Sequence, residues 1–170
     1  MVLGIPADGV SFVNLTMTPL VGAINNEDED LAIHLLTLPG QALDLDHRLP
    51  EQSCVLLHFC AGLWKTRVVK ELVRLGAIMD LWDNEHHTPL CLAAGQGHLP
   101  VVRFFLEQYR ARGASDVGRA ILSPCLNGLN YSHSLLGHVL RCCDPVSAAY
   151  VATARYLVKD CGVDPLLEID

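Results

Sequence analysis

The sequence lacks the features of an exported or membrane-spanning protein. No Lys or Arg precedes Arg48, so the apolar N-terminus has no basic flank of the kind that a secretion signal carries. The longest nearly unbroken apolar stretch, Val55 to Trp64, contains a histidine. It is far shorter than the roughly 18 residues that a membrane span needs. We therefore expect neither export nor membrane insertion.

Motifs for cofactor binding and catalysis are also absent. Neither Gly-x-x-x-x-Gly-Lys nor Gly-x-Gly-x-x-Gly, both of which bind nucleotide phosphates, occurs in the chain. The two Cys/His clusters, at residues 54–60 and 86–91, lack the paired Cys-x-x-Cys spacing of zinc sites. No Cys and His pair is marked by a third orienting group, as a nucleophile requires. We expect no enzyme activity, no cofactor, no metal and no small-molecule substrate.

Basic residues are scarce in the first part of the chain. Residues 1–47 contain seven acidic side chains and no basic one, which equals the whole net charge of −7, while the remaining 12 acidic and 12 basic residues cancel. Nucleic-acid binding normally needs a basic face that neutralises phosphates, so we expect no nucleic-acid partner. The acidic segment instead leaves room for a basic protein partner.

Cysteine usage indicates the compartment. Seven cysteines at irregular spacings are more typical of a reducing compartment than of a disulfide framework. We therefore predict free thiols and an intracellular, cytoplasmic location, with the nucleus as an alternative.

An internal repeat is the strongest positive signal. Residues 88–98 read Thr-Pro-Leu-Cys-Leu-Ala-Ala-Gly-Gln-Gly-His, and the segment 33 residues before residue 88 begins Val-Leu-Leu-His-Phe-Cys-Ala-Gly. Leu57 then aligns with Leu90, and Ala61 with Ala94. A period of this length is typical of a fold in which one small unit is stacked on copies of itself. Function is then expected on the surface that the stack presents.

The best copy predicts two antiparallel helices. Thr88 can cap the first helix, and Pro89 suits its first turn because the missing N–H is not needed there. Gly95 and Gly97 end that helix. The apolar stripe of the second helix consists of Val101, Val102, Phe104, Phe105 and Leu106. Such a hairpin buries its apolar face only against neighbouring copies.

These motifs resemble the ankyrin repeat family, which has a Thr-Pro-Leu-His-x-Ala signature and a 33-residue period. Residues 83–106 keep the family order without a gap. His86 stands where the family usually has a turn glycine, Cys91 replaces the motif histidine and Tyr109 replaces the closing glycine. The resemblance implies an all-α solenoid of stacked helix-turn-helix hairpins with projecting turns. We expect the three departures to alter local turns and not the fold.

The repeat spacing predicts a single domain over residues 1–170, with four repeats at about residues 14–46, 50–82, 83–109 and 131–165. Leu90 to Leu136 spans 46 residues, so residues 110–133 are expected to be an inserted loop with a short helix near residues 116–122. The last copy ends without a polar capping helix. From this we expect the domain to be excised from a longer protein.

The resemblance implies a concave protein-binding surface made of inner helices and projecting turns. Carried over to this sequence, its contact positions are Glu51, Gln52, Cys54, Gly62, Leu63, Asn84, Glu85, His87, Gly95 and Gln96. Trp82, at the turn between the two middle repeats, has no core position and is a residue type that anchors interfaces, with packing on the neighbouring turn as the alternative. For Trp64 the sequence leaves two roles open, contact with a partner protein and local packing.

The inserted segment is the second candidate for a binding surface, since insertions on one face of a repeat array often contribute to it. It contributes the candidates Arg112, Arg119 and Tyr131. A tolerated surface insertion is the alternative, because added loop length costs little free energy.

Taken together, these patterns predict a non-catalytic module that binds a protein or peptide on its concave face and turn tips. One alternative is a regulatory or substrate-targeting ankyrin domain of a larger enzyme or channel. Another is an ankyrin-type inhibitor of a kinase, which the unfinished C-terminus disfavours. A Cys/His metal or redox sensor is the alternative from a different class.

Overall fold

The computed structural model describes residues 13–39, 43–49, 54–113, 125–127, 131–142 and 147–163. For residues 13–18, 125–127 and 131–133 it describes the backbone alone. The chain divides after Asp44 into two compact units, which we describe one at a time.

The first unit contains a pair of packed helices, α1 (Val13–Asn25) and α2 (Glu29–Leu36). The carboxylate of Asp28 accepts a hydrogen bond from the Leu31 N–H at 2.9 Å and so caps α2. The buried side chains of the pair are Leu20, Ala23, Ile24, Ala32 and Leu36. These positions follow the apolar spacing that predicts a helix pair here.

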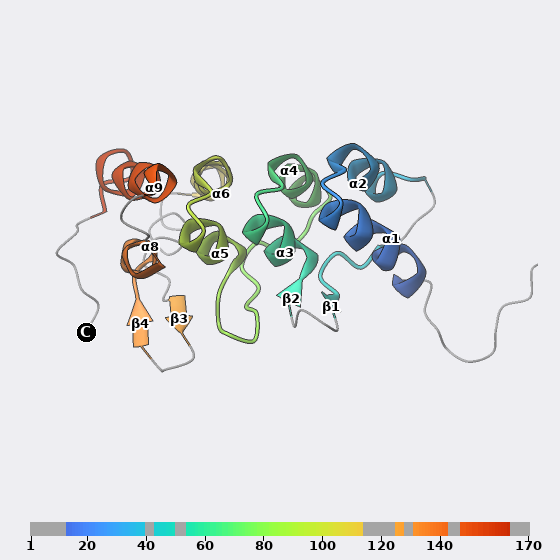
Figure 1. The fold of residues 1–170 in the computed structure, drawn as a ribbon, viewed down its shortest axis with the longest axis horizontal. Helices are drawn as coiled ribbons and strands as arrows, with labels where there is room; N and C mark the ends of the chain where they lie inside the picture. The colour runs from blue at the N-terminus through green and yellow to red at the C-terminus, as the bar shows by residue number, and fades with distance from the viewer. Residues whose placement is uncertain are drawn as a thin grey trace, which may run out of the picture. The chain divides into compact units, whose positions relative to one another are not determined.

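The described residues of the second unit form a row of three helical hairpins (Figure 1). They are α3 (Leu56–Gly62) with α4 (Thr66–Arg74), α5 (Pro89–Gly95) with α6 (Leu99–Arg112), and α8 (Leu135–Cys142) with α9 (Ala148–Lys159). The first helices pack side by side, α3 on α5 and α5 on α8, and form what we call the first-helix row. The second helices pack in the same order, α4 on α6 and α6 on α9. This is the all-α stack of helix-turn-helix units that the repeat predicts.

Two short antiparallel hairpins precede first helices in the described part of the chain. β1 (Arg48–Leu49) pairs with β2 (Cys54–Val55), which runs directly into α3. β3 (Cys125–Asn127) pairs with β4 (Tyr131–His133), which leads to α8. Part of the predicted insertion is therefore a β-hairpin and not loop. The short helix predicted near residues 116–122 lies outside the described residues.

The helix before the insertion is longer than the sequence predicts. α6 continues to Arg112, although Tyr109 stands where a closing glycine is expected. Tyr109 is buried, and its hydroxyl donates a hydrogen bond to Asp80 Oδ1 at 2.5 Å. A side chain tied down in this way stabilises the last turn of the helix, which a glycine would have ended.

Aligned leucines form the core between the hairpins. Leu57 and Leu90, which the 33-residue period superimposes, are both fully buried, and so is Leu136 in the last hairpin. Ala93 and Ala94 have no exposed surface, so the small side chains let neighbouring helices approach closely. Burying each of these leucines stabilises the fold by about 2 kcal/mol. The register that the sequence predicts is the register that the core uses.

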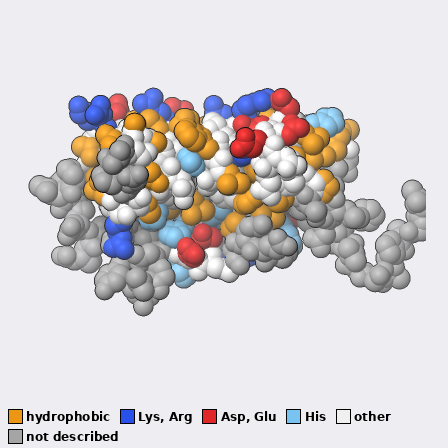
Figure 2. Space-filling view, viewed as in Figure 1, with side chains coloured by type: hydrophobic (Ala, Val, Ile, Leu, Met, Phe, Trp, Pro, Cys, Tyr) orange, Lys and Arg blue, Asp and Glu red, His pale blue; other side chains and the backbone are white. Residues whose placement is uncertain are grey.

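Basic side chains line the edge along which α4, α6 and α9 lie (Figure 2). Two of them bridge consecutive hairpins. Lys70 Nζ of α4 lies 5.8 Å from the centroid of the Phe104 ring in α6, and the Arg103 guanidinium of α6 lies 4.7 Å from that of Tyr156 in α9. Each such cation–π contact contributes about 0.5–1 kcal/mol. These cations therefore help to hold the stack together.

Candidate protein-binding surface

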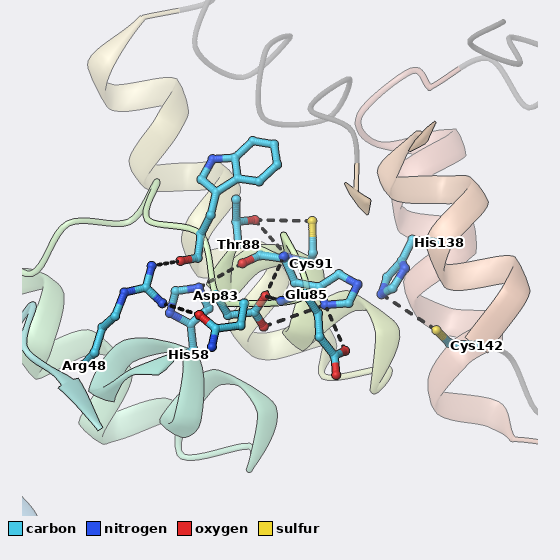
Figure 3. A network of polar contacts seen from close by, with 11 residues as sticks. Arg48, His58, Asp83, Glu85, Thr88, Cys91, His138 and Cys142 are labelled. Atoms are coloured by element: carbon cyan, nitrogen blue, oxygen red, sulfur yellow. Dashed lines mark hydrogen bonds and ion pairs between the residues drawn. The ribbon is translucent and has the colours of Figure 1, made fainter. Parts of the chain in front are cut away.

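The turn that leads into α5 is organised by Asp83 (Figure 3). Its Oδ1 accepts hydrogen bonds from the backbone N–H groups of Glu85 and His87, both at 2.8 Å. The backbone N–H of Asp83 in turn donates to the His87 carbonyl at 2.9 Å. His86 has a φ of 59°, the left-handed conformation that glycine adopts most easily, at the position where the resemblance predicts a glycine. The turn is thus formed in spite of this departure.

Cys91 has a local role at the start of α5. The Thr88 side chain accepts a hydrogen bond from the Cys91 N–H at 3.3 Å and caps the helix, as predicted. Cys91 is also disulfide-bonded, whereas Cys54, Cys60, Cys142 and Cys161 are free. The prediction of free thiols is therefore correct for those four residues and wrong for Cys91. Sequence spacing does not reveal which distant cysteines the stack brings within bonding distance.

His58 links α3 to the turn before α5. It is fully buried, and its Nε2 lies 2.9 Å from the carbonyl oxygen of His87. Because a carbonyl only accepts, Nε2 carries the proton and donates it. Burial lowers the pKa of His58, which favours the neutral ring. The motif histidine thus acts as a neutral connector between two repeats.

Cys54 and His87, both predicted as surface contact positions, are buried in the structure. They are 7% and 6% exposed. Each lies two residues before its first helix, directly before the N-cap residue. The His87 ring contacts Asp83 Oδ2 and Glu85 Oε2, each 3.7 Å from Nδ1. The prediction of His87 as an exposed contact is therefore wrong, and Cys54, although buried, contributes to the lining of a hollow described below.

Gly95 is also buried and packs against α8. A Cβ at this position would lie 2.5 Å from His138 Nε2, so the glycine makes room for the imidazole. His138 Nε2 in turn lies 3.7 Å from Cys142 Sγ (Figure 3). Partial burial raises the pKa of Cys142, which favours the protonated thiol. Among the described residues no group of three or more His, Cys, Asp or Glu side chains is arranged to hold a metal ion.

A hollow of about 530 Å³ opens on the first-helix row between α3 and α5. Five of the predicted contact residues line it: Cys54, Gly62, Leu63, Asn84 and Glu85. The rest of its lining comes from α3, the turn before α5 and α5 itself, and consists of His58, Phe59, Asp83 and Leu92. The structure therefore brings residues from two repeats together around one concave surface, with apolar side chains and carboxylates in the same wall.

Trp82 does not line this hollow. Its ring meets the His86 ring edge-on at 5.9 Å between centroids, and its carbonyl accepts a hydrogen bond from Arg48 Nη2 at 2.7 Å. The same guanidinium donates to Asn84 Oδ1 at 3.1 Å. Arg48 thus braces the turn from 36 residues away, and no sequence signal marked it. These contacts favour the alternative in which Trp82 packs on its own turn.

The remaining predicted contact residues lie elsewhere. Gln96 is exposed at the end of α5, in the position that Leu63 has in α3. Arg112 is exposed at the end of α6, where its guanidinium lies 3.6 Å from Asp80 Oδ2. Glu51, Gln52 and Arg119 lie outside the described residues, and only the backbone of Tyr131 is described.

Trp64 combines local packing with exposure. Its ring stacks on that of His98 at 5.0 Å between centroids and 18° between planes, yet the residue is 52% exposed. His98 is fixed in turn, since its Nε2 donates to the Gly62 carbonyl at 2.8 Å. Burial lowers the pKa of His98, so this ring too is favoured in its neutral form.

A comparison with protein families agrees with this architecture. The model for ankyrin repeats, in three copies, matches residues 20–118, more than half of the chain. The chain belongs to the ankyrin repeat family. Ankyrin repeats are generally protein–protein interaction modules. The ankyrin match ends before α8, so the hairpin α8/α9 joins the stack on the evidence of its packing against α5 and α6.

Two further findings bear on the class of protein. A comparison with curated proteins gives no match. In the part of the chain that the structure describes, every helix is too short or too polar to cross a bilayer.

Proposed function

We propose that this ankyrin domain is a non-catalytic interaction module that binds a protein or peptide in the hollow between α3 and α5 and on the adjoining turn tips. The observation that carries the proposal is the hollow itself. It gathers exposed Leu63, Asn84 and Glu85 from two repeats into one concave wall. Concave surfaces with an apolar floor and a few placed polar groups are where proteins usually hold their ligands.

The scaffold beneath this wall is well braced. His58 ties α3 to the turn before α5, and Asp83 and Arg48 fix the shape of that turn. Side chains on such a frame lose little conformational freedom on binding, which favours affinity. Burial lowers the pKa of His58 and raises that of Cys54, both in the lining of the hollow, which supports binding over acid–base or nucleophilic chemistry there.

The proposal is tested by partner capture with a matched pair of variants. The whole chain is immobilised and exposed to lysate, and bound proteins are quantified by mass spectrometry for wild type, Leu63→Ser with Asn84→Ala, and Ile78→Ser with Glu107→Ala. Both variants replace one exposed apolar and one exposed polar residue, but only the first changes the hollow. We expect the first to lose a specific partner by about tenfold and the second to retain it.

Thermal unfolding of both variants controls for folding. The changes at Leu63, Ile78 and Glu107 are at exposed side chains and should change stability by less than about 0.5 kcal/mol. Asn84→Ala also removes the acceptor of an Arg48 hydrogen bond and should cost about 1 kcal/mol. A partner that the hollow variant retains at full strength would contradict the proposed binding surface.

A further inference from the structure

One end of the hollow is acidic. Glu85 lines it with a side chain that is 77% exposed, and its carboxylate has a contact with His87 Nδ1 at 3.7 Å. Asp83 lines the same end, with its carboxylate held by the turn. The cation on this side is Arg48, whose guanidinium donates to Asn84 Oδ1 and the Trp82 carbonyl. Among the described side chains at this end, two carboxylates stand against one guanidinium, so acidic groups predominate.

The other end is apolar. Leu63 lines the hollow and is 43% exposed, and Trp64 follows it in the chain. Trp64 has a φ of 61°, whereas the equivalent residue one repeat later is Gly97, with a φ of 72°. A non-glycine residue in this left-handed conformation costs about 1 kcal/mol or more. The fold therefore holds an indole at the surface in a strained conformation, on the stacked ring of His98.

Helix α3 separates the two ends. It has seven residues, so the ends lie about 10 Å apart at a rise of about 1.5 Å per residue. An extended peptide rises about 3.3 Å per residue and covers this distance in about three residues. Between the ends, Phe59 and Leu92 contribute apolar lining.

We propose that the hollow takes an extended segment of a partner protein in which a Lys or Arg is followed or preceded, about three residues away, by a large apolar residue. The cation pairs with the Glu85 carboxylate beside Asp83, and the apolar side chain packs on Leu63 and Trp64. This inference rests on the proposed function and specifies the chemistry of its partner.

A random dodecapeptide display library, selected on the intact chain, tests the inference directly. The expected result is enrichment of peptides that carry a Lys or Arg about three residues from Leu, Phe, Trp or Met. Synthetic copies of the enriched peptides are then titrated by fluorescence anisotropy. Raising the salt concentration should weaken their binding to wild type, because the ion pair lies partly in solvent.

Matched variants test which part of the peptide binds at each end of the hollow. Glu85→Gln should weaken the enriched peptides by about fivefold and reduce the salt dependence, whereas Glu107→Gln, which removes the same charge from α6, should change neither. Leu63→Ser should weaken them by about tenfold and leave the salt dependence intact. Peptides that lack a cation, or that bind Glu85→Gln as well as wild type, would overturn the inference, as would the absence of enrichment.

Failure of the inference differs from failure of the proposed function. In one outcome, the enriched peptides carry no cation but still bind Leu63→Ser more weakly than wild type. In another, a partner is lost only by the variant Leu63→Ser with Asn84→Ala. Either outcome would leave the hollow as the binding surface, with a different ligand chemistry. Peptides and partners that bind every hollow variant as tightly as wild type would refute both the inference and the proposed function.

Discussion

Hairpins α3/α4 and α5/α6 have the same backbone design but secure it differently. The N-cap residues Val55 of α3 and Thr88 of α5 have almost the same backbone angles, φ −87° and ψ 163° against φ −86° and ψ 163°. Thr88 caps its helix with a side-chain hydrogen bond, whereas Val55 makes none. α3 is instead secured by His58, which bonds to the neighbouring repeat. One hairpin is stabilised from within and the other by its neighbour.

The same contrast is visible where the first helices end. Gly97 follows α5 in a left-handed conformation that costs glycine little, while Trp64 follows α3 in the same conformation at a cost. The hairpin with the less favourable local sequence is the one that presents Leu63 and Trp64 beside the hollow. Departure from the best local sequence is often found at functional sites, and here it coincides with the proposed binding surface.

The largest expected effect tests whether the two hairpins share one core. Leu57→Ala and Leu90→Ala should each lower the free energy of unfolding by about 2–5 kcal/mol, because each leaves a cavity at a fully buried position. Urea denaturation measures both. A near-zero effect at Leu90 alone would mean that α5 does not bury the face that the repeat register assigns to it.

A smaller effect distinguishes Gly95 of α5 from Gly62 of α3. Gly95→Ala should cost about 1–3 kcal/mol, because its Cβ would overlap His138 Nε2. Gly62→Ala is the matched control. A Cβ there meets nothing within 4 Å, so the change should be neutral or stabilise by up to about 1 kcal/mol. Equal effects in thermal unfolding would show that α8 is not packed against α5 as described.

The caps provide a third comparison. Thr88→Val should lower the free energy of unfolding by about 1 kcal/mol, since the Cys91 N–H loses its acceptor. Val55→Thr should change it by less, because any gain from a new cap is offset by burying a hydroxyl at a position that is 2% exposed. If Thr88→Val has no effect on the urea midpoint, the difference between the two helix starts is not energetic.

The sequence predicted these hairpins because their signals are local. The spacing of apolar residues, Thr88 with Pro89, and the glycines all act within one or two helical turns. They predict the first and second helices and the leucine core, which the structure confirms. The ankyrin resemblance added the stacking order.

The parts that the sequence did not predict depend on contacts between repeats. His87 is buried because Asp83, Glu85 and the His138 ring surround it, and His138 is 51 residues away in sequence. Arg48 braces the turn across 36 residues, and Trp64 finds His98 in the next hairpin. Such contacts between distant residues produce no periodic pattern in the sequence. Positional analogy alone therefore named Cys54, His87 and Gly95 as surface residues.

The smallest expected effect concerns pH and separates His58 from Cys91, which occupies the same position one repeat later. Burial holds the pKa of His58 below its ordinary value of 6.5, as it does that of His98. The unfolded chain therefore binds protons at a higher pH than the folded chain does. The contribution of these rings to stability is complete above pH 6.5 and is lost as the pH falls from 6.5 through the lowered folded-state pKa.

The variant His58→Cys gives α3 the residue that α5 has at the equivalent position, Cys91, and so tests this comparison. We expect the urea midpoint of wild type to decrease when the pH is lowered from 7.5 to 5.5. The decrease should be smaller in His58→Cys, because of the two histidines with a lowered pKa only His98 is left. The variant starts from a lower stability because the His87 carbonyl loses one of its two donors and keeps the Asp83 N–H, which costs about 0.5–1.5 kcal/mol. The pH slope is therefore the informative readout. An unchanged slope would mean that the neutral form of His58 is not what couples the two hairpins.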